Sequence, residues 1–163
     1  MRYKTFLLIL FSLSFFFLQA QNQQSIGTAK DVYVEAMSVS GPTIFSVHYD
    51  MRFKGQKGLG AQAGFGFWGS GGGGALLNFP FGLNYLLGKS THFAELGLGA
   101  TVLTLSGKYI DSKSTFIFVP LAGYRFQPDD NGITVRAFLS PWGLEANGFG
   151  FILAGGLSIG YKF

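Results

Sequence analysis

Ser46, His48 and Asp50 place a hydroxyl, an imidazole and a carboxyl group at alternating positions of one segment. These are the residue types of a serine hydrolase, in which the imidazole takes a proton from the hydroxyl nucleophile. Alternating residues of a strand share one face, but they lie about 6.5 Å apart along the backbone. Because this separation is too long for a hydrogen-bonded chain without help from another strand, we expect no catalytic residues. A lipid-modifying hydrolase centred on His48 is kept as an alternative.

No other pattern in the sequence predicts a catalytic, cofactor or metal site. His92 follows a turn, where a solvated imidazole is expected. The glycine pairs at 64 and 66 and at 97 and 99 lack the strand-to-helix context of a nucleotide-binding loop. Residues 129–132 lack the ligand spacing of a calcium loop. The absence of cysteine excludes disulfides, thiolate metal sites and a cysteine nucleophile.

The elements that must position these residues are β-strands, because apolar residues recur with a period of two. The last segment alternates up to the C-terminus, with apolar and aromatic residues on one face and small or polar residues on the other. Clusters of glycine, proline and polar residues separate the alternating segments. We predict eight strands, at residues 31–38, 43–53, 59–68, 75–87, 92–105, 114–126, 133–140 and 149–163.

The composition indicates that the outer face of these strands meets lipid. The chain has 19 Phe, 7 Tyr and 25 Gly, and 12% of its residues are charged, whereas soluble domains carry about 25%. The prediction is therefore an all-β fold, a single eight-stranded antiparallel up-and-down transmembrane β-barrel. A single bent strand across Gly41 and Pro42 would leave seven strands, which is unfavourable for a single-chain bacterial barrel.

The N-terminus predicts a cleavable signal peptide at residues 1–20. Arg2 and Lys4 precede an apolar run that ends near Leu18, and this run is shorter than the roughly 20 apolar residues of a membrane-spanning helix. An uncleaved anchor is the alternative. Residues 21–30 are then a short periplasmic lead and residues 31–163 the barrel. Cleavage removes two positive charges from the formal net charge of +4, so the sequence does not predict nucleic-acid binding.

The alternation assigns side chains to lipid or lumen. Phe45, Val47, Tyr49, Met51 and Phe53 are expected to face lipid, which sends the intervening residues inward. Applied to every strand, the rule predicts a luminal polar network of Glu35, His48, Asp50, Arg52, Glu95, Arg125, Arg136 and Lys162. Because the interior of an eight-stranded barrel is only wide enough for its side chains, these groups must pair and close the lumen. A narrow passage for ions or a small solute is the alternative, since inward glycines could leave empty volume or relieve curvature.

The turns and the ends of the strands suggest an orientation. With both termini in the periplasm, the segments at 69–74, 106–113 and 141–148 form the outer loops. Their shortness argues against adhesion, and a barrel that adheres or docks a partner through these loops is kept as a further alternative. Outward aromatic residues near the periplasmic turns would form an interfacial girdle, and Trp68 and Trp142 would lie near the other rim.

The alternating strands, the signal peptide and the terminal Phe163 together resemble small outer-membrane β-barrel proteins of Gram-negative bacteria, the OmpA-like and OmpX-like barrels. Similar stretches are NYLLG at 84–88, ELGLG at 95–99, YRFQP at 124–128 and GYKF at 160–163. The resemblance implies an outer-membrane location with lipid as the surrounding partner. It also implies that Tyr161 and Phe163 are read by the barrel-assembly machinery. The expected function is a non-enzymatic, structural or narrow-passage membrane component without a cofactor, and the oligomeric state is left open.

Overall fold

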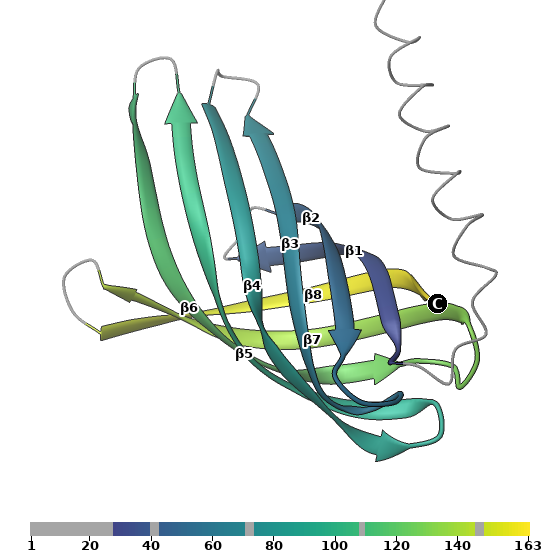
Figure 1. Ribbon diagram of the computed structural model, residues 1–163. Coiled ribbons are helices and arrows are strands. Elements are labelled where there is room, and N and C mark those ends of the chain that lie inside the picture. Colours follow the sequence, from purple (N-terminus) through teal and green to yellow (C-terminus); the bar gives the residue numbers. More distant parts are fainter. Residues whose placement is uncertain (1–27, 40–42, 71–73, 108–109, 146–148) are drawn as a thin grey trace, which may run out of the picture.

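The protein forms a closed eight-stranded barrel, seen in a computed structural model that describes residues 28–39, 43–70, 74–107, 110–145 and 149–163. Each strand pairs antiparallel with the next, and β8 pairs with β1 (Figure 1). The predicted up-and-down barrel is confirmed. The strands are β1 (Lys30–Val39), β2 (Thr43–Arg52), β3 (Gly58–Ser70), β4 (Gly74–Lys89), β5 (His92–Gly107), β6 (Ile110–Phe126), β7 (Gly132–Glu145) and β8 (Phe149–Lys162).

The N-terminal part of the barrel consists of two strands, as predicted, and not of the single bent strand that was the alternative. β1 and β2 pair antiparallel, from Ser38 opposite Thr43 to Lys30 opposite Met51. One continuous strand across Gly41 and Pro42 is therefore wrong, although these two residues lie outside the described part. The predicted signal peptide at 1–20 and the lead up to residue 27 also lie outside it. No helix in the described residues is long and apolar enough to cross a membrane.

Two predicted loops are wrong because the strands continue through them. β5 extends to Gly107 and β6 begins at Ile110, so most of the expected loop at 106–113 is strand. β7 likewise continues to Glu145, within the expected loop at 141–148. In the first case the serine and threonine residues pair across the ladder: the hydroxyls of Thr104 and Ser114 lie 3.0 Å apart. A polar alternating segment therefore forms strand here as an apolar one does.

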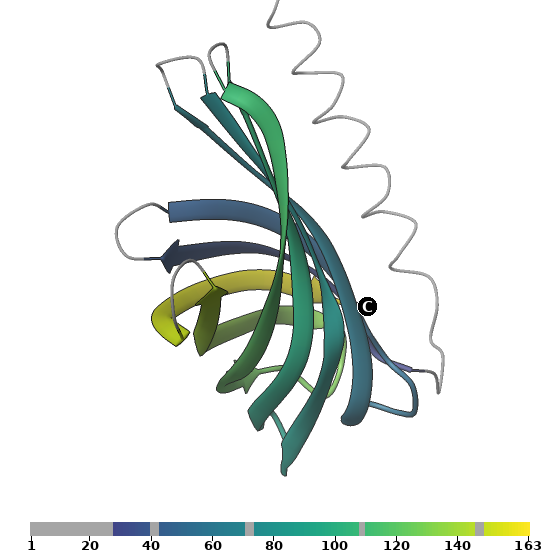
Figure 2. The same cartoon turned by 90° about the vertical axis from the view of Figure 1, so that its left-hand side faces the viewer.

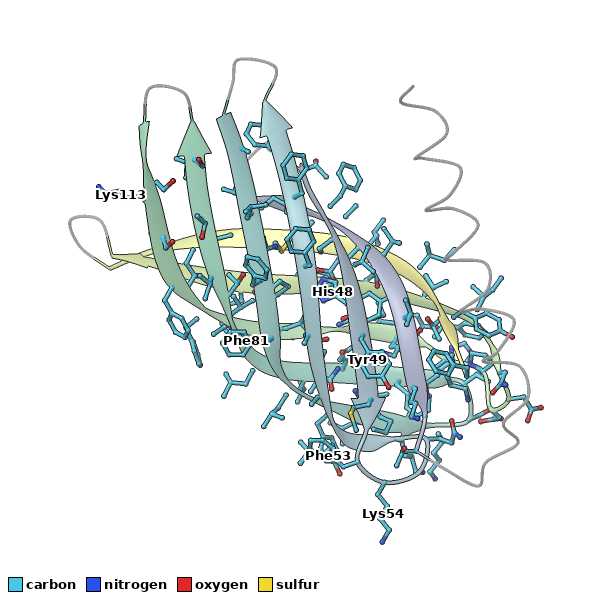
Figure 3. All side chains as sticks on the ribbon, turned by 45° about the horizontal axis from the view of Figure 1, so that its top comes forward. His48, Tyr49, Phe53, Lys54, Phe81 and Lys113 are labelled. Atoms are coloured by element: carbon cyan, nitrogen blue, oxygen red, sulfur yellow. The ribbon has the colours of Figure 1, made fainter. Side chains whose placement is uncertain are left out.

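The predicted faces agree with the observed exposure of the side chains. Phe45, Val47, Tyr49 and Phe53 of β2 and the following turn are 57%, 52%, 40% and 49% exposed, whereas Ser46, His48, Asp50 and Arg52 are buried. Figure 3 shows Tyr49 and Phe53 on this stretch and Phe81 on β4, where it is 49% exposed. The outer surface is thus a continuous apolar layer, and the polar side chains point inward.

The interior has two layers. The half next to the turn that carries Lys54 (Figure 3) is filled by charged and amide side chains. The other half holds a cluster of apolar side chains, all of which are buried. Its members are Met37, Ile44, Ile117, Leu121, Phe138 and Ala154.

The seam between β6 and β7 is short. Its ladder has five register pairs, from Phe126 opposite Val135 to Ala122 opposite Leu139. Continuing this register would set Pro120 opposite Pro141, and neither proline has an N–H to donate. The Ser140 hydroxyl instead donates to the carbonyl of Pro120 over 2.5 Å. Beyond this point the two strands diverge, as Figures 1 and 2 both show.

Candidate functional site

Glu95 on β5 is the centre of the luminal network. Its carboxylate accepts two hydrogen bonds from Arg125, from Nε over 3.0 Å and from Nη2 over 2.9 Å. It accepts two more from Arg136, both over 2.9 Å. The three residues are 1% exposed or less. Two guanidinium groups thus grip one carboxylate in the bidentate geometry that is the strongest form of this contact.

Glu95 with Arg125 and Arg136, called the Glu95 clamp below, is part of a longer chain of alternating charges. On one side Arg125 reaches Asp50 over 3.1 Å, and Asp50 pairs with Arg52 over 2.5 Å. On the other side Arg136 approaches Glu35 over 3.4 Å. Three guanidinium groups therefore face three carboxyl groups, and these side chains come from β1, β2, β5, β6 and β7. Asn84 adds β4 as the sixth strand of the network. Asn84 donates to Asp50 over 2.6 Å and to Glu95 over 2.8 Å, and it accepts from Arg52.

The clamp also spans the short seam. Arg125 and Arg136 are register partners on β6 and β7, so two like charges lie side by side on the inner face. Such a pair is destabilising by itself. Glu95 binds both arginines, offsets the repulsion between them and links β5, β6 and β7. The charge network therefore reinforces the strand pair that has the fewest register partners among the described residues.

His48 has a different environment from the one expected of a catalytic base. Its Nε2 lies 2.7 Å from the Ser46 hydroxyl, because the two side chains lean together across the distance that the backbone sets. The sequence argued against a hydrogen-bonded chain of Ser46, His48 and Asp50. The contact between Ser46 and His48 forms, whereas Asp50 bonds to Arg52, Asn84 and Arg125. The nearest carboxylate is Glu35, not Asp50, and it approaches the same Nε2 over 3.6 Å. The ring stacks on Tyr33 at 4.8 Å, and Ser46 and His48 are 5% and 4% exposed.

This arrangement lacks the relay of a hydrolase. In a triad the acid binds one ring nitrogen and orients the other toward the nucleophile. Here hydroxyl and carboxylate share Nε2, while Nδ1 has no hydrogen-bond partner among the described residues. The described residues also contain no group of three His, Cys, Asp or Glu side chains that could hold a metal ion.

Lys162 is inward and 1% exposed, but it lies apart from the other seven residues of the predicted network. Its Nζ donates to the carbonyls of Pro128 and Asp129 over 2.5 and 2.7 Å, and to Oε1 of Gln56 over 2.7 Å. Gln127 Nε2 donates to the Gln56 carbonyl over 2.8 Å. Two turns are thereby tied together across the base of the barrel.

Several luminal residues were absent from the predicted network. Asp31 is 2% exposed and accepts from the Thr134 hydroxyl over 2.8 Å. Gln62 accepts from the Tyr33 hydroxyl over 2.8 Å. Asp31 shares its face with Glu35, and Gln62 lies between two glycines that the sequence places inward. The alternation that identified the other residues would have identified these two as well.

The inward glycines give room to neighbouring side chains. A Cβ on Gly64 would lie 2.7 Å from His48 Nδ1, and one on Gly160 would lie 2.5 Å from Tyr33 Cβ. A Cβ on Gly60 would collide with the Arg52 guanidinium. The sequence left open whether these glycines create a cavity or relieve curvature. In the structure the side chains of Arg52, His48 and Tyr33 fill the space next to these three glycines.

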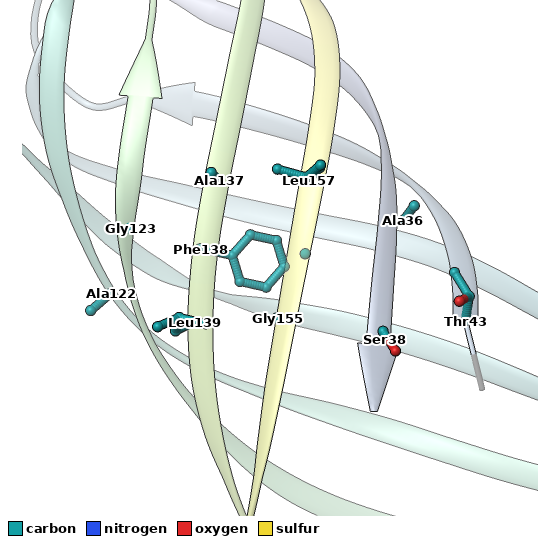
Figure 4. A pocket seen from close by; sticks show the side chains of 11 residues that line it. Ala36, Ser38, Thr43, Ala122, Gly123, Ala137, Phe138, Leu139, Gly155 and Leu157 are labelled. Carbon is teal, nitrogen blue, oxygen red and sulfur yellow. The ribbon is translucent and has the colours of Figure 1, made fainter. Parts of the chain in front are cut away.

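An internal cavity among the described residues is smaller than the hollow on the outer wall. One internal cavity of about 40 Å³ lies between the polar and the apolar layer, next to Glu35, His48, Gln62 and Phe138. A larger hollow of about 600 Å³ lies on the outer wall over β7, β8 and β1, where Gly155, Ala137 and Ala36 leave a depression beside Leu157 (Figure 4). Its lining is small and apolar apart from the hydroxyls of Ser38 and Thr43.

The end of the barrel that was expected to face the periplasm carries exposed aromatic residues. Tyr49, Tyr85 and Tyr124 are 40%, 45% and 45% exposed. His92, which was expected to be solvated, is exposed and lies 2.6 Å from the Tyr124 hydroxyl. The terminal Phe163 forms two backbone hydrogen bonds with Lys30, of 2.9 and 3.3 Å. The last residue therefore takes part in barrel closure.

Comparison with known proteins shows a shared fold. No protein-family model and no curated protein matches the sequence. Among solved structures, the chain is similar to the N-terminal β-barrel domain of Pseudomonas aeruginosa OprF, with a TM-score of 0.63 and 13% identity over 83% of this chain and 97% of that chain. It is also similar to Neisserial surface protein A, with a TM-score of 0.54 and 15% identity over 83% of this chain and 94% of that chain. These likenesses confirm the predicted resemblance at the level of fold.

Proposed function

We propose that the protein is an integral outer-membrane barrel with a closed lumen, which acts as a structural membrane component and not as a pore or an enzyme. The observation that carries this proposal is the Glu95 clamp with its flanking ion pairs, which crosses the lumen from β2 to β7.

The location is supported by the surface. Leu98, Phe116, Leu153 and Leu157 are 56%, 64%, 63% and 65% exposed, and water is a poor solvent for such a continuous apolar layer. In hydrocarbon, strands are tolerated only where the sheet closes on itself and satisfies its backbone groups. The fold shared with OprF and Neisserial surface protein A adds to this argument. Export by the signal peptide and recognition of Tyr161 and Phe163 by the barrel-assembly machinery belong to the same proposal.

Closure of the lumen is supported at two levels. The charge network fills one layer, and the turns joined by Gln56, Gln127 and Lys162 cover the base below it. A cavity of about 40 Å³ has room for one or two water molecules, since a water occupies about 30 Å³ in the liquid. No continuous path for a hydrated ion is expected.

Single-channel conductance in a planar bilayer tests this closure. We expect no conductance steps from the parent protein. We expect discrete steps when Arg52, Arg125 and Arg136 are all replaced by Ala, because this removes three buried side chains and leaves three carboxylates to draw water inward. The matched control replaces the exposed Lys54, Lys57 and Lys89 with Ala, which changes the charge equally and should leave the bilayer silent. Discrete steps from the parent itself would overturn the proposal and identify a small pore.

The absence of lipid hydrolysis is a separate expectation. His48 and Ser46 are buried, and Nδ1 of His48 has no carboxylate partner among the described residues to complete the relay described above. Purified protein incubated with outer-membrane lipids should therefore release no fatty acid. Release by the parent, lost in a folded His48→Ala variant, would contradict this expectation and favour the hydrolase.

A further inference from the structure

β4, β5 and β6 are 16, 16 and 17 residues long, and with β3 they rise beyond the remaining strands (Figures 1 and 2). In this extension the outward face becomes polar on β5 and β6, whereas Phe67 and Leu77, in the row of Thr104, keep it apolar on β3 and β4. The outward face of β5 and β6 carries the hydroxyls of Thr104, Ser106, Ser112 and Ser114, which bond to one another. Such a face is suited to water and headgroups and marks the upper limit of the hydrocarbon layer.

The inward face of the extension is apolar on β3, β4 and β5. Trp68, Leu76 and Leu105 are successive register partners on β3, β4 and β5, and Leu103 lies one row below and packs on the apolar cluster. Trp68 and Leu105 remain 36% and 39% exposed. We call these four residues the concave face. Lys113, near the upper end of β6 (Figure 3), is the register partner of Leu105 and is exposed.

The concave face is accessible from the side. Above Leu121, β6 has no register partner on β7 in the described residues. The outer side of the same stretch of β6 carries Phe116 and Phe118, which are 64% and 55% exposed and lie at the level of the hydrocarbon. In the described residues, no backbone ladder between these two strands separates the bilayer from the interior of the extension. Pro120 and Pro141 prevent the ladder from closing it.

We propose that the concave face binds the hydrocarbon chain of an anionic single-chain amphiphile, which enters from the outer leaflet between β6 and β7. The four apolar side chains supply the surface for the chain, and the ammonium group of Lys113 lies where the head group would emerge. The cluster formed by Ile117, Leu121, Phe138 and its neighbours closes the floor. The site therefore holds its ligand above the charge network, and it goes beyond the proposed function because it does not require the lumen to open or to stay closed.

Quenching of Trp68 by spin-labelled stearic acid tests this site. The chain has two tryptophans, so Trp142→Phe leaves Trp68 as the reporter in phosphatidylcholine vesicles. We expect quenching that saturates and that unlabelled stearic acid reverses. The matched control is Thr104→Trp in a Trp68→Phe, Trp142→Phe background, which puts the reporter on the opposite face at the same height. At that position quenching should rise in proportion to the concentration of the spin-labelled stearic acid and should not saturate.

Three variants define the site further. Leu105→Asn should abolish the saturable quenching, whereas Thr104→Asn on the opposite face should keep it. Lys113→Gln should weaken the binding of stearic acid but not of stearyl alcohol. Cysteines at 118 and 143, on the two diverging strands, joined by a bifunctional thiol reagent that spans the gap, should block entry. The same reagent on cysteines at 124 and 137, which are already partners, should not.

The proposal is overturned if quenching of Trp68 is proportional to the concentration of the spin-labelled probe and is not reversed by unlabelled stearic acid. It is overturned also if iodide in the water quenches Trp68 fully while the lipid probe does not, because the face then lines a water-filled vestibule. Protection of Trp68 from both quenchers, together with a doubled molecular mass, would assign the face to a second copy of the chain. Unchanged binding in the cross-linked 118–143 variant would exclude the lateral route.

Discussion

Replacing Glu95 with Ala is expected to lower the free energy of unfolding by about 3–5 kcal/mol, the cost of removing one partner from a buried ion pair. Arg125 and Arg136 are 0% and 1% exposed, and both would lose two hydrogen bonds at once. They would also repel each other directly across the short seam between β6 and β7. Equilibrium urea unfolding of the barrel in lipid vesicles, followed by tryptophan fluorescence, measures the change.

The matched control is Asp130→Ala, which removes an exposed carboxylate and should change the free energy of unfolding by no more than about 0.5 kcal/mol. A double-mutant cycle adds a stricter test. Glu95→Leu combined with Arg136→Leu removes an anion and a cation together, so it should cost less than the sum of the two single changes. Equal effects of Glu95→Ala and Asp130→Ala would show that the clamp does not hold the barrel together.

Gly156→Ala is expected to destabilise the barrel by about 1–3 kcal/mol, the usual cost of overpacking an interior. The added Cβ would lie 2.5 Å from Cζ of Phe138 and 3.0 Å from the carbonyl oxygen of Ala36. Phe138 is 6% exposed and belongs to the apolar cluster, so its ring has little room to move. The same unfolding experiment measures the loss.

Gly155→Ala is the control for this prediction, because the neighbouring glycine points to the outside. Its new Cβ would meet Leu139 Cδ2 at 3.3 Å, the flexible end of an exposed side chain, and a change within about 0.5 kcal/mol is expected. Phe138→Leu should partly rescue Gly156→Ala by vacating the space. If Gly155→Ala and Gly156→Ala cost the same, backbone entropy and not packing explains the glycines.

The strand positions and faces could be read from the sequence because a strand has a period of two whatever its neighbours are. The segment from Phe45 to Phe53 shows this most clearly, since every apolar residue in it that was assigned to lipid lies on the outer side. The rule was less successful beyond the bilayer. There Thr104 to Ser114 alternate hydroxyl residues on the outer face, and a polar segment without apolar alternation looks like a loop.

Membership of the lumen was predictable for the same reason, and Glu35, Asp50, Glu95 and the three arginines are all buried inside. Their pairing was not. Which carboxylate meets which guanidinium depends on the stagger of eight strands around the barrel, and residues that meet across the lumen are far apart in sequence. Arg125 thus binds Asp50, 75 residues away.

The sequence by itself determined the class of fold, the inward and outward faces and the types of charge in the lumen, because these follow from local alternation. The tertiary structure alone decided that Glu95 bridges the two arginines, that Ser46 reaches His48 and that Pro120 comes to face Pro141 at the end of a short seam. Those features require the register between strands, which is set when the barrel closes and is written in no single segment of the chain.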